Sequence, residues 1–271
     1  MKIGLIGSRS VLGRVLDETF TLGGHQISSF TRKGENGSNA FDVLVDQPPA
    51  SLAGLDAVIY LSWDTKERTK GSQRAHVEAA GRCAKHCKDL GVKFLFLSTV
   101  HASRDSQSLY GRYKYEAEIL ISNFMGKSAR VGLVADDSFP LLLTSIRKSL
   151  RSHPWLSAFL DWPVYAISSK TLVEEIEKTL LHWPSDALLW LAPTKPASLS
   201  LIGSWGNSSM WRFKGCKLFG NLVALIPLRG AKLDAWRGLV GMSKNIYNPL
   251  ESRGLEVSDV DWKNQLDPSS H

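Results

Sequence analysis

The sequence predicts an α/β protein built on a doubly wound parallel sheet, with a small, mostly helical lobe in its C-terminal part. Short apolar runs alternate with longer amphipathic stretches through the first half of the chain, which is typical of βαβ units. Three of the first four apolar runs are almost free of polar residues, as strands buried on both faces are. A glycine-bounded turn joins the first run to the first amphipathic stretch.

The expected elements follow one another in regular order up to about residue 183. Strands are expected at residues 2–7, 25–32, 56–62, 93–99 and 129–134. Helices are expected at residues 11–23, 74–91, 110–126 and 171–183. The first two helices close at a glycine, which suits a helix C-terminus, and the last has an acidic start that complements its dipole.

A change of composition near residue 194 divides the chain into two parts. From there the sequence is first rich in Pro, Ser and Gly and then mixes Trp, basic and apolar residues without clear strands. The length of 271 residues suits one large domain with a smaller appendage. We therefore expect a first domain at residues 1–193 and a C-terminal lobe with its tail at residues 194–271.

The overall charge and hydropathy restrict the class of partner. The net charge is +7, but the basic residues are spread along the chain, which favours an anionic small molecule over nucleic acid. No apolar run approaches the roughly 18 residues that a membrane span needs. We expect a small-molecule substrate, no nucleic acid and no membrane.

The three cysteines, Cys83, Cys87 and Cys216, indicate a reducing compartment, because their number is odd and the chain shows no signal peptide. We therefore expect a cytoplasmic protein. Cys83 and Cys87 lie one helical turn apart with His86 nearby, but no second ligand pair follows at zinc-site spacing. Buried helical thiols are favoured over a metal site.

The stretch GSRSVLG, at residues 7–13, has the position of a dinucleotide-binding turn, since it follows a buried strand and precedes an amphipathic helix. Gly7 and Gly13 stand where such a turn needs glycines, so that the backbone can approach a diphosphate. Ser10 replaces the middle glycine, and its side chain would either crowd the phosphate or donate to it. The turn predicts a Rossmann-type domain.

The end of the second expected strand bears on which dinucleotide is bound. Enzymes that prefer NAD place a carboxylate there for the ribose hydroxyls, whereas a 2′-phosphate requires a cation. The strand ends with Arg32 and Lys33, and Arg9 projects from the glycine turn. These three cations favour NADP(H) as the cofactor, with NAD(H) as the alternative.

Tyr110 and Lys114 form a candidate acid–base pair at the start of an expected helix. Their spacing places both side chains on one helix face. A lysine ammonium beside a phenol lowers the phenol pKa toward the working pH, as proton transfer at an alcohol or carbonyl requires. Ser98 and Thr99 end the fourth strand, at the sheet edge where open α/β sheets bind ligands.

These stretches resemble one family, the extended and atypical branch of the short-chain dehydrogenase/reductase superfamily, of the NAD(P)-dependent epimerase/dehydratase type. The matching stretches are GLIGSRSVLG, AGLDAVIYLS, KFLFLSTVHA, LYGRYKYEAE and, more loosely, ARVGLV, so the resemblance covers about residues 1–190. Ser10 departs from the family, and His76 stands where the family commonly has an asparagine. The short interval between Thr99 and Tyr110 implies a trimmed loop over the site.

The resemblance implies a role for each matching residue. Tyr110 would be the general acid/base, Lys114 would lower its pKa and bind the nicotinamide ribose, and Thr99 or Ser98 would bind the substrate oxygen. The residues expected at the cofactor are Gly7, Ser8, Arg9, Ser10, Leu12 and Gly13 at the phosphates, Arg32 and Lys33 at the 2′-phosphate, Asp42 and Val43 at adenine, and Leu61, Ser62 and His76 beside them. No metal is expected.

The family resemblance implies an oxidoreductase or epimerase acting on a hydroxyl or keto carbon, most plausibly of a nucleotide-activated sugar. Aromatic and basic side chains of the C-terminal lobe suit a nucleotide: Trp205, Trp211, Arg212, Lys214, Arg229, Lys232, Trp236 and Arg237. Two alternatives stay open, an NADPH-dependent reductase of a non-sugar carbonyl and a non-catalytic NADP(H) sensor or scaffold. The sequence leaves open the substrate, the choice between epimerase, reductase and dehydratase, and a homodimeric state.

Overall fold

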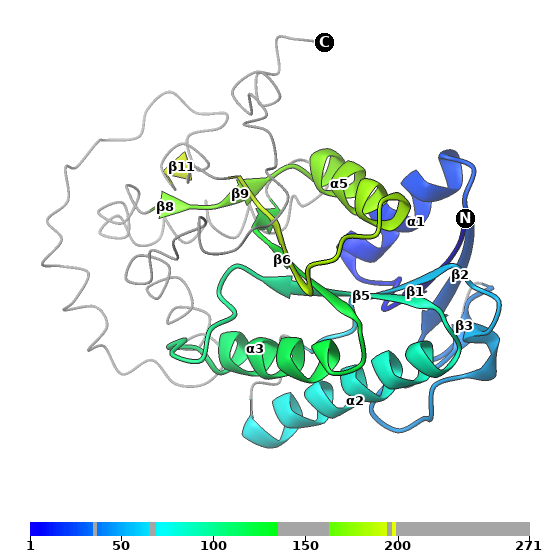
Figure 1. The fold of residues 1–271 in the computed structure, drawn as a ribbon, viewed down its shortest axis with the longest axis horizontal. Coiled ribbons are helices and arrows are strands. Elements are labelled where there is room, and N and C mark those ends of the chain that lie inside the picture. The colour runs from blue at the N-terminus through cyan, green and yellow to red at the C-terminus, as the bar shows by residue number, and fades with distance from the viewer. Residues whose placement is uncertain (35–36, 65–68, 135–162, 194–196, 199–271) are drawn as a thin grey trace, which may run out of the picture.

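The computed structural model describes residues 1–34, 37–64, 69–134, 163–193 and 197–198. Seven strands form one parallel sheet in the order β10-β6-β5-β4-β1-β2-β3, which confirms the predicted fold class (Figure 1). Their bounds are β1 Lys2–Ile6, β2 Gln26–Thr31, β3 Asn39–Ala40, β4 Ala57–Tyr60, β5 Lys93–Thr99, β6 Lys127–Val131 and β10 Leu188–Leu191. The C-terminal lobe, with Cys216 and the aromatic and basic residues predicted there, lies outside the described residues.

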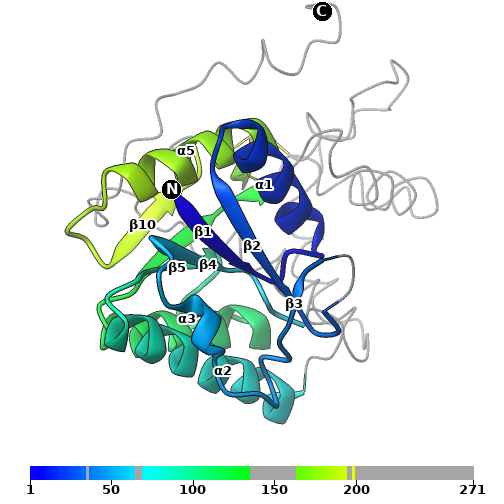
Figure 2. The same ribbon diagram turned by 90° about the vertical axis from the view of Figure 1, so that its right-hand side faces the viewer.

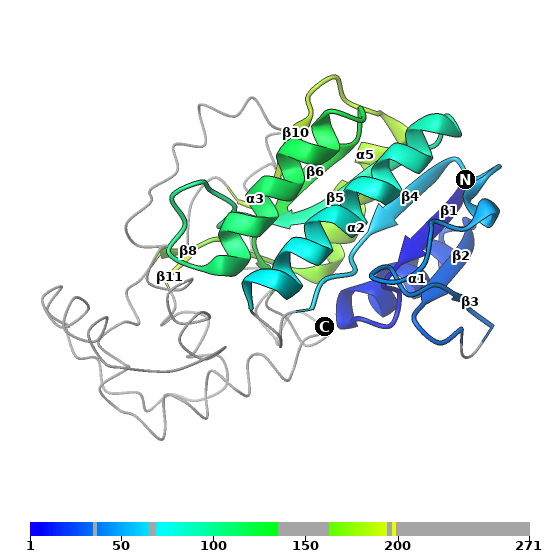
Figure 3. The ribbon, with the colours of Figure 1, turned by 90° about the horizontal axis from the view of Figure 1, so that it is seen from below.

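Within the described residues, four long helices cover the two faces of the sheet. They are α1 Val11–Leu22, α2 Lys70–Asp89, α3 Leu109–Ser122 and α5 Ser169–Leu181. Figure 2 shows α1 and α5 on one face and α2 and α3 on the other, and Figure 3 shows α2 and α3 side by side. The doubly wound arrangement follows from the alternation of strands and helices along the chain.

Alternate residues of the central strands point to opposite faces and build two separate cores. Val58 and Tyr60 pack under α2 and α3, whereas Ala57 and Ile59 pack under α1 and α5. All four residues are fully buried, as strands of a parallel sheet covered on both faces are. Phe94 and Phe96 of β5 join the first core, and Leu95 joins the second.

Each long helix begins after a serine or threonine whose side chain accepts a backbone N–H three residues later. These N-caps are Ser10, Thr69, Ser108 and Ser168. The caps explain two differences from the predicted helix starts. α2 begins at Lys70 instead of residue 74, and α5 begins at Ser169, so its first turn contains no acidic residue and the predicted acidic start is wrong.

The remaining elements are short. They are a 3₁₀ turn at Ala50–Leu52, the parallel pair β7 Leu133–Val134 with β9 Ala166–Ile167, and the antiparallel pair β8 Pro163–Val164 with β11 Ala197–Ser198. The strand predicted at residues 129–134 is thus divided between β6 and β7. Neither β3 nor β10 was predicted. β3 has only two residues, whereas β10 is a short apolar run that buries Leu189 and Leu191 beside β6.

A buried ion pair attaches α3 to the sheet. The Glu118 carboxylate of α3 accepts hydrogen bonds from Arg130 Nε and Nη2 of β6, at 3.0 and 2.7 Å. Ser98 Oγ of β5 donates to the same carboxylate at 2.5 Å. Burial raises the pKa of Glu118, and the hydrogen bonds from Arg130 and Ser98 oppose that rise. Since these bonds satisfy the charge inside the protein, they fix α3 over β5 and β6.

Candidate functional site

The carboxyl ends of the parallel strands bring four separate chain segments to one edge of the sheet. β1 leads into the glycine turn, β2 into Arg32 and Lys33, β4 into residues 61–64, and β5 ends at Thr99. β1 pairs with β2 on one side and β4 on the other, so the strand order reverses at β1. Open α/β sheets bind their ligands at such a reversal.

The glycine turn after β1 leaves no room for side chains at its two glycines. Gly7 has a φ of +93°, and a Cβ added there would lie 2.8 Å from Ser62 N. A Cβ at Gly13 would lie 2.7 Å from the carbonyl oxygens of Gly7 and Ser8. Only glycine therefore allows the first turn of α1 to lie against β1 and the chain after β4. This cradle fits a diphosphate that must approach the backbone closely.

Ser10 caps α1, and this role explains its presence where a glycine was expected. Its Oγ accepts a hydrogen bond from Gly13 N at 2.9 Å, while its own hydroxyl hydrogen is left to act as a donor. Arg9 and Ser10 are exposed beside the start of α1, Leu12 is half-buried, and Ser8 is buried. The free N–H groups of a helix start attract anions, so the cap is compatible with phosphate binding.

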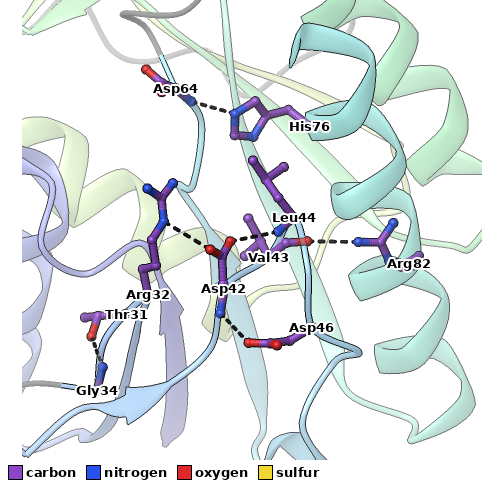
Figure 4. Close-up of polar contacts among 10 residues, drawn as sticks. All are labelled: Thr31, Arg32, Gly34, Asp42, Val43, Leu44, Asp46, Asp64, His76 and Arg82. Atoms are coloured by element: carbon purple, nitrogen blue, oxygen red, sulfur yellow. Dashed lines mark hydrogen bonds and ion pairs between the residues drawn. The ribbon is translucent and has the colours of Figure 1, made fainter. Parts of the chain in front are cut away.

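At the end of β2, Arg32 lies beside Asp42 (Figure 4). Arg32 Nε is 3.4 Å from Asp42 Oδ2, and Leu44 N donates to Asp42 Oδ1 at 3.1 Å. The side chain of Arg32 is 64% exposed, and Lys33 is exposed next to it. The structure thus brings Arg32 to the predicted adenosine side of the site, together with a carboxylate.

The segment that carries Asp42 and Val43 is fixed to α2. Arg82 Nη2 donates to Val43 O at 2.9 Å, and Asp42 N donates to Asp46 Oδ2 at 2.7 Å (Figure 4). Val43 is buried, whereas the Asp42 side chain is 25% exposed. The backbone that carries both predicted adenine-side residues is therefore fixed by Arg82 of α2 and by Asp46 of the same segment.

Tyr110 and Lys114 lie together at the start of α3, as the spacing predicts. Lys114 Nζ is 5.7 Å from the centre of the Tyr110 ring and donates to Leu97 O of β5 at 2.8 Å. Burial lowers the pKa of Lys114 to about 7, and the charge of Glu118 opposes this shift. A lysine so placed can change its charge next to a phenol near neutral pH.

The two hydroxyls at the end of β5 have different partners. The Ser98 hydroxyl is bound to the Glu118 carboxylate on the α3 side, away from solvent. Thr99 Oγ1 accepts a bond from His101 N at 3.3 Å and keeps its own hydrogen for donation. Burial lowers the pKa of His101 to about 4, so its imidazole is neutral at pH 7. Thr99 is thus the better placed of the two to bind a substrate oxygen.

Sequence reasoning missed two residues near the Tyr110–Lys114 pair: Trp63, which contacts both members of the pair, and Gln73 of α2, which binds Trp63. Trp63 Nε1 donates to Gln73 Oε1 at 2.9 Å, and the Trp63 ring stacks on His76 at 5.3 Å between centroids. A tryptophan directly after a buried strand, at the sheet edge where ligands bind, was the available signal.

His76 lies in the first part of α2, on the cofactor side that the resemblance implied. Its Nε2 accepts a bond from Asp64 N at 3.1 Å (Figure 4). The neutral ring therefore carries its proton on Nδ1, which is buried and has no hydrogen-bond partner within the described residues. Burial lowers the pKa of His76 and favours this neutral form.

Three further expectations can be compared with the described residues: the buried thiols, the absence of a metal site and the absence of a membrane-spanning helix. Cys83 and Cys87 are buried free thiols, and burial raises the pKa of each to about 12. In the described ranges no three His, Cys, Asp or Glu side chains gather as metal ligands would. None of the helices in those ranges has the length and apolar character to cross a membrane.

Solved structures with a similar fold are known, although sequence comparison finds no relative. No protein-family model and no curated protein matches the sequence. A nucleoside-diphosphate-sugar epimerase from Staphylococcus aureus is similar with a TM-score of 0.63 and 13% identity, over 93% of this chain and 94% of that one. MoeE5, in complex with UDP-glucuronic acid and NAD, is similar with a TM-score of 0.60 and 17% identity, over 76% of this chain and 81% of that one.

A reductase shares the fold as well. The dTDP-4-dehydrorhamnose reductase from Clostridium acetobutylicum is similar with a TM-score of 0.57 and 15% identity, over 74% of this chain and 78% of that one. The three neighbours are thus an epimerase, a reductase and a protein bound to UDP-glucuronic acid and NAD. The chain has their Rossmann-like fold.

Replacing Gly7 by alanine is expected to cost more stability than replacing Gly24 by alanine. Both glycines have a left-handed backbone, which costs other residues roughly 1–2 kcal/mol. An alanine Cβ at position 7 would additionally lie 2.8 Å from Ser62 N, whereas at position 24 nothing lies within 4 Å. Urea denaturation measures the two losses, and dinucleotide titration should show weaker binding for Gly7→Ala alone. Equal losses in stability and equal affinities would contradict the close-approach argument.

Proposed function

We propose that this protein is an NADP(H)-dependent oxidoreductase or epimerase that acts on a hydroxyl or keto carbon. One observation carries the proposal: a buried lysine ammonium lies beside Tyr110 at the carboxyl edge of the sheet. The glycine cradle at Gly7 and Gly13 opens at the same edge and fits a dinucleotide diphosphate. The two features together suit hydride transfer coupled to proton transfer.

In this mechanism each residue has one task. A bound nicotinamide supplies or accepts the hydride. Tyr110 exchanges the proton of the reacting hydroxyl through its phenol oxygen, and the charged form of Lys114 stabilises the phenolate. Thr99 donates its hydroxyl hydrogen to the substrate oxygen and holds that oxygen near Tyr110.

The preference for NADP(H) rests on the cations at the end of β2 and at the glycine turn. Arg32 is exposed at the adenosine side, and Lys33 and Arg9 are exposed on the segments next to it. A guanidinium can bind a 2′-phosphate with two hydrogen bonds. The Asp42 carboxylate contacts Nε of Arg32, so the two terminal nitrogens of the Arg32 guanidinium could bind the phosphate.

The proposed substrate is a nucleotide-activated sugar. Support comes from the solved neighbours, which include a nucleoside-diphosphate-sugar epimerase and a dTDP-4-dehydrorhamnose reductase. Both reaction types occur among them, so the proposal covers an epimerase and a reductase. Residues 1–193 would bind the cofactor and residues 194–271 would complete the substrate site. The free thiols of Cys83 and Cys87 support a cytoplasmic location.

Replacing Tyr110 by phenylalanine is expected to lower turnover about 10²–10⁴-fold, because general acid–base help is worth that much. Dinucleotide affinity should be unchanged. Turnover is measured by mass spectrometry on a panel of UDP- and dTDP-sugars incubated with NADP(H) or NAD(H). Tyr115→Phe, on the same helix, is the control and should keep full activity. A Tyr110→Phe variant that turns over at the wild-type rate would show that the assigned role is wrong.

Replacing Arg32 by alanine is expected to reduce the preference for NADPH over NADH about tenfold or more, since a hydrogen bond to a charged group is worth about 1.5–3 kcal/mol. Calorimetric titration with each cofactor gives the ratio. Lys85→Ala removes an exposed cation near the C-terminal end of α2 and should leave the ratio unchanged. An unchanged ratio in Arg32→Ala would rule out the 2′-phosphate contact.

A further inference from the structure

Trp63 is in contact with both members of the proposed acid–base pair. Its ring meets the Tyr110 ring edge-on, with 6.3 Å between centroids, and Lys114 Nζ lies 4.3 Å from its centre. Trp63 follows β4 at the carboxyl edge and is half-buried. It therefore stands between the solvent and the buried lysine.

The lysine ammonium is enclosed on its other sides by β5. Phe96, which is fully buried, presents its ring 4.2 Å from Nζ, and Leu97 O accepts a hydrogen bond from it. Trp63 and Tyr110 are both partly exposed, whereas Phe96 and Leu97 are buried. The Trp63 ring lies closer to Nζ, at 4.3 Å against 5.7 Å for the Tyr110 ring, so Trp63 is the nearer of the two groups that shield the ammonium from water.

Three hydrogen bonds and one ring stack hold Trp63 against α2. Gln73 accepts from the indole N–H and donates to Asp64 O at 3.3 Å. Asp64 N donates to His76 Nε2, and the His76 ring stacks on the indole. Gln73 and His76 are both buried, so the position of the indole is set by the helix.

We propose that Trp63 is a positioning residue for Lys114: its indole, fixed by Gln73 and His76 of α2, covers the lysine ammonium and keeps water from it. The site then couples α2 to the acid–base pair on α3. The structural part of this inference stands on the contacts of Trp63 alone, and its effect on catalysis rests on the proposed function.

The consequence is a lysine that changes charge near neutral pH. Burial lowers the pKa of Lys114 to about 7, so it is charged below that pH and neutral above it. Removing the indole loses a cation–π contact, which alone would lower the pKa further. It also admits water, which favours the ammonium more strongly, and the net change is a higher pKa.

The other charged and titratable groups around Lys114 belong to several neighbouring elements. Glu118 on α3 raises the pKa of Lys114, and Arg130 of β6 holds that carboxylate. The charge of Lys114 lowers the pKa of His76 of α2, and the charge of Asp64 raises it. Tyr110 is the remaining neighbour. A substitution at Trp63 removes none of these groups, although it changes the ring contacts of His76 and Tyr110.

The test is a pH titration of Lys114 in the full chain, in which the lysine side chains are labelled with ¹³C at Cε and the titration is monitored by NMR. The Lys114→Arg variant identifies the Lys114 signal by its loss. In Trp63→Leu the titration midpoint is expected to rise by about one unit or more, a tenfold change in the protonation equilibrium. Trp63→Phe keeps an aromatic cover and should keep a midpoint near that of the wild type.

A matched control uses a second tryptophan of the described residues that lies over a lysine. Trp183 covers Lys93 at the amino end of β5, with Nζ 5.7 Å from the ring centre and donating to Leu180 O. Trp183→Leu should leave the Lys114 midpoint unchanged. Gln73→Leu, which removes the acceptor of the indole N–H, should raise the midpoint by less than Trp63→Leu does.

The outcomes separate this inference from the proposed function. A midpoint in Trp63→Leu equal to that of the wild type overturns the inference, whatever the enzyme's activity. Should Trp63→Leu fail to fold, Gln73→Leu decides: a raised midpoint supports the inference, and an unchanged one overturns it. If the protein is active, the pH profile of kcat/KM should move upward with the Lys114 midpoint; a profile that stays in place overturns the catalytic part alone.

Discussion

The buried carboxylate of Glu118 is the constraint on which the arrangement of the site depends. It lies between α3 and the sheet, where Arg130 of β6 and Ser98 of β5 bind it. Leaving such a charge without its partner costs about 3–5 kcal/mol, so the helix has one stable position over these strands. Lys114 lies one turn earlier on the same helix and Tyr110 two turns earlier, and this anchor thereby places both at the carboxyl edge.

The second constraint is the close approach of the backbone at the glycine turn between β1 and α1. Gly7 and Gly13 let the start of α1 lie against the end of β1 and against Ser62. The cradle and the anchored helix belong to segments about a hundred residues apart, yet the parallel sheet brings them to one edge. Trp63, which follows β4 between them, then joins α2 to Lys114. The candidate site is thus assembled from segments that the helices and strands of the sheet hold in place.

Features with a local cause could be predicted from the sequence. The burial of β4 on both faces, the pair at Tyr110 and Lys114, and the glycines of the turn all depend on residue types or spacing along the chain. Contacts between distant segments could not be predicted, because no short pattern records them. The bond from Ser98 to Glu118 and the stacking of Trp63 on His76 are of this kind. The observed starts of α2 and α5 differ from the predicted starts because the capping residues Thr69 and Ser168 lie outside the stretches with helical periodicity.

The central claim is that a nicotinamide dinucleotide lies across the carboxyl edge from the glycine turn to Tyr110. A crystal structure of the full chain with NADP⁺ bound tests it most directly. The account predicts the diphosphate at the start of α1 between Gly7 and Gly13, the 2′-phosphate at Arg32, and the nicotinamide between Thr99 and Tyr110. A dinucleotide bound elsewhere, or bound with its nicotinamide remote from Tyr110, would contradict it.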